Sequence, residues 1–397
     1  MLTPSQRRWF AACVLYLSSA LNYLDRQVLA ALAPTIKSDF HLNSEQYGYI
    51  LSALSITYAF SAPVMGLLID RIGLTVGAAL VVGTWSLVGM STGWVTGFAS
   101  LLVCRAALGV AEAGGIPCTG KASAVYLESR HRALGAGISQ IGLTAGLVMA
   151  PILTAWIQPH YGWRPVFVVA GALGFLWIPL WWAAARTAPA LPEDASIPRV
   201  SSREMLRDRR FLGLIVANVL SMTVYSLWTN WVTLFLTTRY GLEQNAANVR
   251  FAWIPPNFAS LGALFGGWLA LRLIRGGAPV VPARLRISLY SAIMVLATAA
   301  APLMPSPALA TAAICVSFFS VTCLSVNYYS IPLDIFGAER AAFGVSALTG
   351  AFGLMQFFLS PLIGRWADHF GWLPMCTLVA LCPLLSYFVL RYSLRRA

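Results

Sequence analysis

Four ionisable residues stand inside apolar stretches of this 397-residue chain, where a charge is unfavourable in a membrane. Asp25 and Arg26 are neighbours in one apolar run, and Arg105 and Glu112 lie in another. Such a charge costs roughly 2.5–3.5 kcal/mol at the centre of a membrane helix, so it faces protein or water and marks a functional site. Arginine binds carboxylates with a two-pronged geometry, and a buried carboxylate can gain or lose a proton. These residue types predict a site that binds an organic anion and transfers protons.

The spacing of these four residues predicts which of them share a helix face. Arg105 and Glu112 are seven residues apart, nearly two helical turns, so both point the same way at ~10 Å along the axis. Asp25 and Arg26 are ~100° apart around a helix, so we expect one to face a water-filled path and the other adjacent helices. We predict that Arg26 and Arg105 bind the substrate carboxylate and that Asp25 and Glu112 carry the proton. The alternative is a structural ion pair that sets only the packing of two helices.

Aromatic, amide and hydroxyl side chains in other apolar runs are candidates to complete the substrate site. The first half contributes Tyr23, Tyr58 and Gln140. For any single candidate, helix packing or an interhelical hydrogen bond is the alternative role. As a set, they suggest that the first half holds the charge and the second half reads hydroxyl groups, as a polyhydroxy acid requires. The second half shows no deeply placed charge and offers Tyr225, Trp228, Asn230, Asn257, Asn327, Tyr328, Thr349 and Gln356.

The apolar runs that carry these residues predict an all-α membrane protein with 12 transmembrane helices. The chain is 58% hydrophobic and 10% charged, whereas a soluble chain carries about 25% charged residues. The first run continues through Asp25 and others follow it, so we interpret it as a span and not as a signal peptide. Runs long enough for a span, which needs ~20 residues, lie near residues 9–33, 46–69, 74–96, 98–126, 133–157, 164–185, 211–238, 247–271, 286–304, 308–333, 342–364 and 372–391.

A polar, proline-containing loop at residues 186–210 divides the runs into two sets of six. This predicts an N-terminal six-helix bundle over residues 1–185 and a C-terminal one over residues 211–397. The halves also echo each other, because Gly66–Arg71 and Gly267–Arg272 both have the form G-x-x-x-x-R. Two related bundles around a central site are typical of secondary transporters.

The distribution of basic residues predicts the orientation in the membrane. With the N-terminus inside, 19 of the 27 Lys and Arg residues fall in cytoplasmic segments, five outside and three within spans, which places both termini in the cytoplasm. The net charge of +13 therefore does not indicate nucleic acid as a partner. Lys121, near the inner end of the fourth span, is expected to extend to the interface. The seven cysteines fall in apolar runs and predict no disulfide and no metal site, and we expect no cofactor.

The loop after the second run carries a recognisable pattern. It reads Gly-Leu-Leu-Ile-Asp-Arg-Ile-Gly from Gly66 to Gly73. This resembles the G-x-x-x-D-R-x-G signature between helices two and three of the major facilitator superfamily, although Leu74 follows where a basic residue is usual. The resemblance implies that Gly66, Asp70, Arg71 and Gly73 form a cytoplasmic latch in an alternating-access cycle. The alternative is a surface turn that ends a helix.

Two further segments resemble one branch of that superfamily. Residues 22–26 (Asn-Tyr-Leu-Asp-Arg) and 105–114 (Arg-Ala-Ala-Leu-Gly-Val-Ala-Glu-Ala-Gly) are similar to the anion:cation symporter family, which includes hexuronate and hexonate proton symporters and the sialic-acid and vesicular glutamate carriers. The resemblance implies proton-coupled uptake of an organic anion by a non-enzymatic carrier. The asymmetry between the two halves favours a sugar acid such as a hexuronate or hexonate as that anion. We expect a monomer in a bacterial cytoplasmic membrane, with the bilayer, the anion and protons as its partners.

Other transport functions remain open alternatives. Another mono- or dicarboxylate, an aromatic acid, or coupling to sodium fits the same residues. A drug:proton antiporter would require unpaired acids, and two arginines beside two acids disfavour it. Phosphate-ester exchangers place an arginine in each half, and animal monocarboxylate carriers place one deep in helix eight. Here the eighth run carries no charge from Trp253 to Leu271 and reaches Arg272 only at its inner end, which disfavours both.

Overall fold

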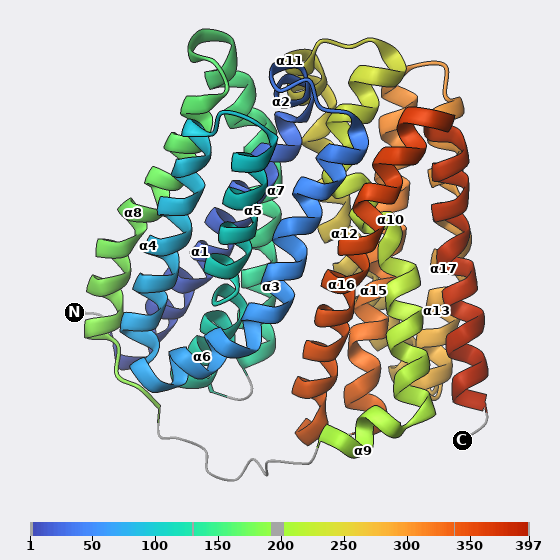
Figure 1. Ribbon diagram of the computed structural model, residues 1–397. Helices are drawn as coiled ribbons and strands as arrows, with labels where there is room; N and C mark the ends of the chain where they lie inside the picture. Colours follow the sequence, from blue (N-terminus) through green and yellow to red (C-terminus); the bar gives the residue numbers. More distant parts are fainter. Residues whose placement is uncertain (1–2, 129–130, 192–201, 337, 396–397) are drawn as a thin grey trace. The chain divides into compact units, whose positions relative to one another are not determined.

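The structure is a computed structural model that describes residues 3–128, 131–191, 202–336 and 338–395, and Figure 1 shows these residues as helices and their connections. No strand occurs in these ranges. Continuous helices are expected for such an apolar chain, because lipid offers no partner to backbone N–H and C=O groups, which must bond within their own segment. The prediction of an all-α fold is confirmed.

Eleven helical segments among the described residues are long and apolar enough to cross a membrane. The helix α1 (Pro4–Ala31) is not one of the eleven, but its 28 residues also exceed the length that a span needs. Together these twelve segments match the twelve apolar runs, and the protein is a multi-pass membrane protein. The part of the central loop at 192–201 lies outside the described residues, and the short helix α9 (Ser202–Arg207) follows it.

The chain folds into two compact units. Unit 1 is Met1–Asp194 with Glu243–Trp253, and unit 2 is Ala195–Leu242 with Ile254–Ala397. The helices of unit 1 are α1, α2 (Ala33–Asp39), α3 (Ser44–Ile72), α4 (Leu74–Ser91), η1 (Thr92–Trp94), α5 (Phe98–Glu112), α6 (Gly115–Tyr126), α7 (Arg132–Tyr161), α8 (Arg164–Thr187), α11 (Gln244–Ala247) and η3 (Asn248–Ala252). Those of unit 2 are α9, α10 (Arg209–Tyr240), α12 (Ile254–Arg275), α13 (Val280–Met294), α14 (Ala297–Ala300), η4 (Ala301–Leu303), α15 (Pro307–Phe336), α16 (Ala338–Phe370) and α17 (Trp372–Arg395).

Helix α1 is the central element of unit 1, since it packs on α7 and α8. The indole nitrogen of Trp177 on α8 donates to the carbonyl oxygen of Val14 at 2.7 Å, and the stacked ring of Trp181 lies beside it. On α7, a Cβ at Gly142 would lie 2.9 Å from the carbonyl oxygen of Tyr16. Only glycine permits this approach of the two backbones.

Helices α3 and α5 form a second close pair in unit 1. The hydroxyl of Thr57 on α3 donates to the carbonyl oxygen of Ala106 on α5 at 2.8 Å. A Cβ at Gly109 would collide with Thr57 and with the carbonyl of Leu54. This contact fixes the height of α5 against α3, and thereby positions the charged residues of α5.

The fourth predicted run is broken, because α5 ends at Glu112 and α6 begins at Gly115. Pro117 in the first turn of α6 lacks an N–H, and its ring would clash with the carbonyl of Ala113 in a continuous helix. The proline therefore accounts for the break. As a result, Glu112 is the last residue of α5.

The segment Glu243–Trp253 groups with unit 1, although the sequence places it within the second half. Thr35 donates to the side-chain oxygen of Gln244 through its backbone nitrogen at 2.9 Å and its hydroxyl at 2.8 Å. The amide of Asn248 donates to the carbonyl oxygen of Ala31 at 3.0 Å. These bonds attach α11 and η3 to the end of α1 and the start of α2.

Unit 2 is built around α15, which packs on α10, α12, α13 and α16. Its core includes Leu324, Tyr328 and Ile331 of α15 with Leu214 of α10. All seven cysteines are free thiols, and no group of three or more His, Cys, Asp or Glu residues that could hold a metal lies in the described part of the chain.

Candidate functional site

Arg26 and Glu112 form an ion pair within unit 1, although 86 residues separate them in the chain. The Nε atom of Arg26 donates to Oε2 of the Glu112 carboxylate. The guanidinium also lies 4.5 Å from the ring centre of Tyr58 and 5.5 Å from that of Tyr23, in the range of cation–π contacts. The Glu112 side chain is fully buried, whereas the Arg26 side chain is 23% exposed. The structure thus brings Glu112, Tyr23 and Tyr58 around the partly exposed side chain of Arg26, whose Nη2 atom is buried without a hydrogen-bond partner among the described residues.

Asp25 turns away from Arg26, as the angle between neighbouring helical residues predicts. Its carboxylate lies against α4, where its Cγ is 3.7 Å from the position that a Cβ would take at Gly89. The residue is buried. Arg26 is therefore the exposed member of the pair and Asp25 the one that faces a neighbouring helix.

Arg105 is fully buried, in contrast to Arg26. None of its three guanidinium nitrogens has a hydrogen-bond partner among the described residues. Its guanidinium carbon lies 5.4 Å from the ring centre of Phe167. It interacts electrostatically with Glu112 and Asp25. Arg105 therefore adds positive charge near Glu112 and Asp25 from a fully buried position.

The remaining candidate in unit 1 is Gln140. It is an exposed residue on α7, and its backbone carbonyl accepts from the Thr144 hydroxyl at 3.3 Å. No contact of Gln140 with the Arg26–Glu112 pair is observed within the described ranges.

Three of the polar residues expected to line a site in the second half are packed in the core of unit 2. Trp228 is fully buried and packs edge-on against Phe235 with ring centres 5.3 Å apart. Asn327 is fully buried and donates to the carbonyl oxygen of Cys323 at 2.9 Å. Tyr328, also buried, shares a hydrogen bond with Ser386. These contacts favour the packing role that the sequence left open.

Other second-half candidates keep part of their surface exposed. Asn230 donates to the carbonyl oxygen of Ser226 at 3.0 Å, and the Thr349 hydroxyl donates to that of Val345 at 3.0 Å. Tyr225 packs against Phe318 and is also partly exposed. Asn257 and Gln356 are partly exposed as well.

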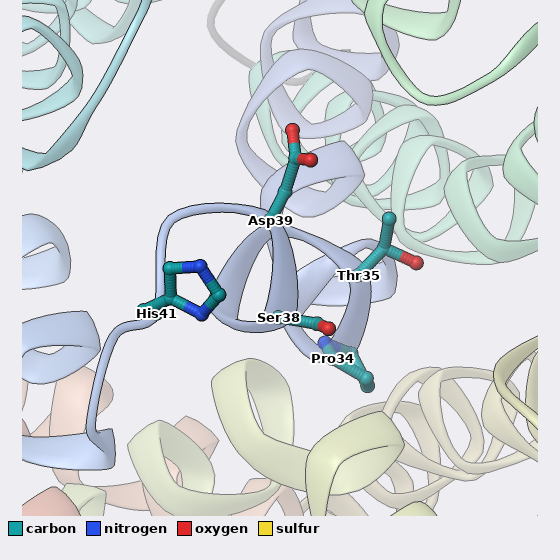
Figure 2. A pocket seen from close by; sticks show the side chains of 5 residues that line it. All are labelled: Pro34, Thr35, Ser38, Asp39 and His41. Carbon is teal, nitrogen blue, oxygen red and sulfur yellow. The ribbon is translucent and has the colours of Figure 1, made fainter.

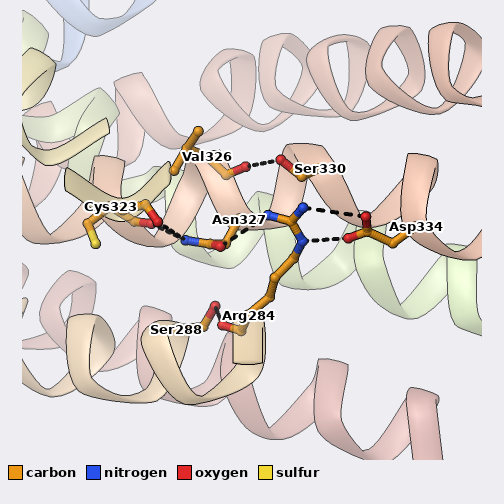
Figure 3. A network of polar contacts seen from close by, with 8 residues as sticks. Arg284, Ser288, Cys323, Val326, Asn327, Ser330 and Asp334 are labelled. Carbon is orange, nitrogen blue, oxygen red and sulfur yellow. Dashed lines mark hydrogen bonds and ion pairs between the residues drawn. The ribbon is translucent and has the colours of Figure 1, made fainter. Parts of the chain in front are cut away.

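Unit 2 also contains a largely buried ion pair that the sequence analysis missed. Arg284 of α13 donates to Asp334 of α15, with Nε 2.5 Å from Oδ2 and Nη2 3.4 Å from Oδ1. Its Nη1 donates to the side-chain oxygen of Asn327 at 3.3 Å, and Figure 3 shows the resulting network. The two charged side chains are 14% and 12% exposed. The sequence had assigned Arg284 to a loop, but the seven-residue spacing of Asn327 and Asp334 on α15 could have indicated a shared polar face.

The signature residues 66–72 form the last two turns of α3 and not a loop as expected, and an ion pair holds them as well. Lys121 of α6 donates to Asp70 Oδ1 at 2.8 Å and to the carbonyl oxygen of Ile69 at 3.1 Å. Lys121 thus binds the signature aspartate, a partner that the sequence did not indicate. Gly73 ends α3 with φ = 84°, a conformation that favours glycine, and Arg71 is exposed. Gly66 faces Pro117, which lies 3.9 Å from where its Cβ would be.

A cavity of about 550 Å³ lies on α2 and the turn that follows it. It is lined by Pro34, Thr35, Ser38, Asp39 and His41, which Figure 2 shows. Asp39 accepts from the indole nitrogen of Trp163 at 3.0 Å. None of the predicted site residues lines this cavity, so it is separate from the charged cluster.

Comparison with known proteins identifies relatives along the whole chain. The sequence model described as Major Facilitator Superfamily matches residues 15–358. The hexuronate transporter of Escherichia coli K12 is 28% identical, with 96% of this chain and 93% of that protein covered. The galacturonate transporter of Dickeya chrysanthemi is 30% identical over 66% of this chain and 81% of that protein. The D-galactonate transporter of Escherichia coli O6:H1 is 22% identical over 99% and 97%.

Solved structures show the same fold. A bacterial homologue of the human lysosomal transporter Spinster, in an inward-facing and occupied conformation, matches with a TM-score of 0.75 at 20% identity. The match covers 99% of this chain and 96% of that one.

Proposed function

Because this chain belongs to the Major Facilitator Superfamily, and is therefore a membrane transporter and not an enzyme, we propose that it is a proton-coupled symporter for the uptake of a sugar acid. The transporters for hexuronate, galacturonate and D-galactonate that it resembles support this substrate class. The observation that carries the proposal is the Arg26–Glu112 pair, in which a buried carboxylate holds an arginine whose side chain is partly exposed.

Arg26 supplies the anion-binding group in this proposal. A guanidinium stays charged at any physiological pH and matches a carboxylate with two parallel hydrogen bonds. The rings of Tyr23 and Tyr58 support its position. A substrate carboxylate therefore competes with Glu112 for the same donors.

Glu112 supplies the proton-binding group. When it gains a proton, it loses the charge that attracts Arg26, and the guanidinium is free to bind the substrate anion. The proton and the anion then cross the membrane together. Asp25 is the second candidate for a proton carrier, and the buried charge of Arg105 acts on both acids.

The remaining roles are assigned from burial. Tyr225, Asn230 and Thr349 are partly exposed and are our candidates for contacts with substrate hydroxyl groups. We assign Trp228 and Asn327 to packing because both are fully buried. The signature residues Gly66, Asp70, Arg71 and Gly73 act as a latch in the conformational cycle. The carrier is a monomer in a bacterial cytoplasmic membrane with both termini in the cytoplasm.

The proposal is tested with purified protein in proteoliposomes under an imposed pH gradient. Uptake of labelled D-galacturonate, D-glucuronate and D-galactonate is compared with that of succinate and benzoate. We expect accumulation of at least one sugar acid against its gradient, and dissipating the pH gradient with an ionophore should abolish accumulation.

The variant Glu112→Gln separates proton coupling from substrate binding. It should still exchange external for internal sugar acid, because exchange needs no net movement of protons, but it should not accumulate substrate. Accumulation by Glu112→Gln at the wild-type level would refute the role of Glu112. Accumulation of only succinate or benzoate would refute the substrate class.

A further inference from the structure

Asn22 lies on the same face of α1 as Arg26, one helical turn away. Its side chain is buried, with the whole residue 8% exposed, and its Nδ2 atom has no hydrogen-bond partner within the described ranges. Nδ2 lies 4.0 Å from the position that a Cβ would take at Gly115, and the ring of Trp85 lies 3.7 Å from the same position. Gly115, three residues after Glu112 in the chain, has no side chain and thus leaves room for the buried amide of Asn22.

The amide of Asn22 also faces the Glu112 carboxylate. The two side chains interact, although their contact does not meet the geometry of a hydrogen bond. The second carboxylate oxygen of Glu112, Oε1, is likewise buried without a partner within the described ranges, since Arg26 binds only Oε2. A donor and an acceptor, both buried and both unsatisfied, therefore lie next to each other beside the ion pair.

We propose that Asn22 is a positioning residue for anion transport, which holds the Glu112 carboxyl group when Arg26 turns from Glu112 to the substrate. This inference rests on the proposed function. Without such a partner, release of Arg26 would leave the buried carboxyl group with no hydrogen bond, which is unfavourable. Asn22 lowers that penalty and so makes Arg26 available to the anion.

An amide suits this role in both protonation states of Glu112. Its NH₂ group donates to an ionised carboxylate, and its oxygen accepts from a protonated carboxyl group. Arg26 offers donors only, so it can bond to the carboxyl oxygens but cannot accept the O–H of the protonated form. Asn22 therefore supports Glu112 throughout the exchange of partners, and a leucine of similar size would not.

A double-mutant cycle tests the inference. Binding of D-galacturonate, with D-glucuronate and D-galactonate as further probes, is measured by calorimetry on the purified full chain for the wild type, Asn22→Leu, Glu112→Gln and the double variant. We expect Asn22→Leu to weaken binding about tenfold in the wild-type background. In the Glu112→Gln background the same substitution should change affinity less than about twofold, because no charge then holds Arg26.

Asn218→Leu is the matched control. Asn218 is a fully buried asparagine of α10 that donates to the carbonyl oxygen of Leu348. This variant should lose thermal stability to a similar extent as Asn22→Leu but keep its affinity. If Asn22→Leu does not fold, the isosteric Asn22→Asp decides, and we expect at least tenfold weaker binding from it at neutral pH.

The outcomes separate the two proposals. Wild-type affinity in Asn22→Leu, or an equal loss in both backgrounds, would overturn the role of Asn22 while the proposed function stands. A wild-type protein that binds none of the three probes would overturn the proposed function and this inference with it.

Discussion

At Arg26 one guanidinium is shared between a fully buried carboxylate and two tyrosine rings, and about a quarter of its side chain stays exposed. Arg105 carries the same charge on a neighbouring helix but is fully buried. The two arginines that the sequence treated alike therefore differ in access. Of these two, only Arg26 has an exposed part of its side chain at which an anion could replace Glu112 as the partner.

Arg26→Lys tests whether the shape of the guanidinium matters in addition to its charge. An ammonium group cannot form the paired hydrogen bonds, so we expect sugar-acid affinity to fall about 10–100-fold. The measurement is binding of D-galacturonate to the purified variant. Arg164→Lys, at an arginine stacked on Trp163, is the control and should bind normally. Unchanged affinity in Arg26→Lys would show that a point charge is sufficient.

Sequence reasoning identified Asp25, Arg26, Arg105 and Glu112 because charges in apolar runs are rare. It could not identify Arg26 and Glu112 as partners, since that pairing depends on how the fold of unit 1 arranges α1 and α5. Asn22 stands in the resembling segment 22–26, but nothing in the sequence singled it out as a site residue, because its burial beside Glu112 depends on the fold. Trp228 and Asn327 were expected at a substrate site, but both are fully buried. When a helix is largely apolar on all its faces, hydrophobic periodicity does not indicate which face is buried.

At the scale of single helices, the α3–α5 contact determines where the charged face of α5 lies. Gly109 permits the contact, and Thr57 bridges it with a hydrogen bond to Ala106. The sequence predicted both helices but not their closeness, since several glycines stand in these runs and only the fold shows which one meets a backbone. The break before α6 was missed for a related reason, because proline is tolerated in many membrane helices.

Gly109→Ala should disrupt this contact. The added Cβ would collide with the carbonyl of Leu54 and with Thr57, so we expect destabilisation by about 1–3 kcal/mol and weaker transport. Thermal unfolding of the purified protein measures the first effect. Gly137→Ala is the control, because nothing lies within 4 Å of its added Cβ, and its stability should be equal or slightly higher. Equal melting of both variants would contradict the packing described.

The α13–α15 ion pair makes a prediction for unit 2. Removing one partner leaves a largely buried charge uncompensated, so Arg284→Ala should lower the free energy of unfolding by about 3–5 kcal/mol. Replacing both partners, as in Arg284→Met with Asp334→Leu, should recover part of the loss because no buried charge remains. Thermal unfolding in detergent measures both effects. A double variant that is less stable than the single one would indicate that the pair itself is strongly stabilising.

At the scale of the whole molecule, the spans followed from composition. Eleven of the twelve predicted spans are long and apolar enough to cross a membrane among the described residues, and α1 is long enough by its 28 residues. The segment Gly66–Gly73 resembled the signature of the Major Facilitator Superfamily, and the family match confirms that assignment. The ion pair of Lys121 with Asp70 was not predictable, because it joins residues 51 positions apart.

Asp70→Asn tests the proposed latch. The pair with Lys121 is exposed, so its loss should change stability by less than about 1 kcal/mol. We expect the transport rate to fall about tenfold, equivalent to ~1.4 kcal/mol in the barrier, while substrate affinity stays the same. Asp39→Asn, at another exposed ion pair, is the control and should transport normally. A loss of affinity in place of rate would contradict a latch.

The position of Glu243–Trp253 limits how far this protein can be treated as two interchangeable modules. The gene's second half encodes these residues, yet Ala247 and Asn248 are fully buried in unit 1. A fragment cut at the central loop would lack part of its own interior and would leave Ala31 and Thr35 without their partners. A carrier split at the central loop therefore needs both fragments for unit 1 to be complete. If the first half is exchanged with that of a relative, the segment Glu243–Trp253 must be exchanged with it.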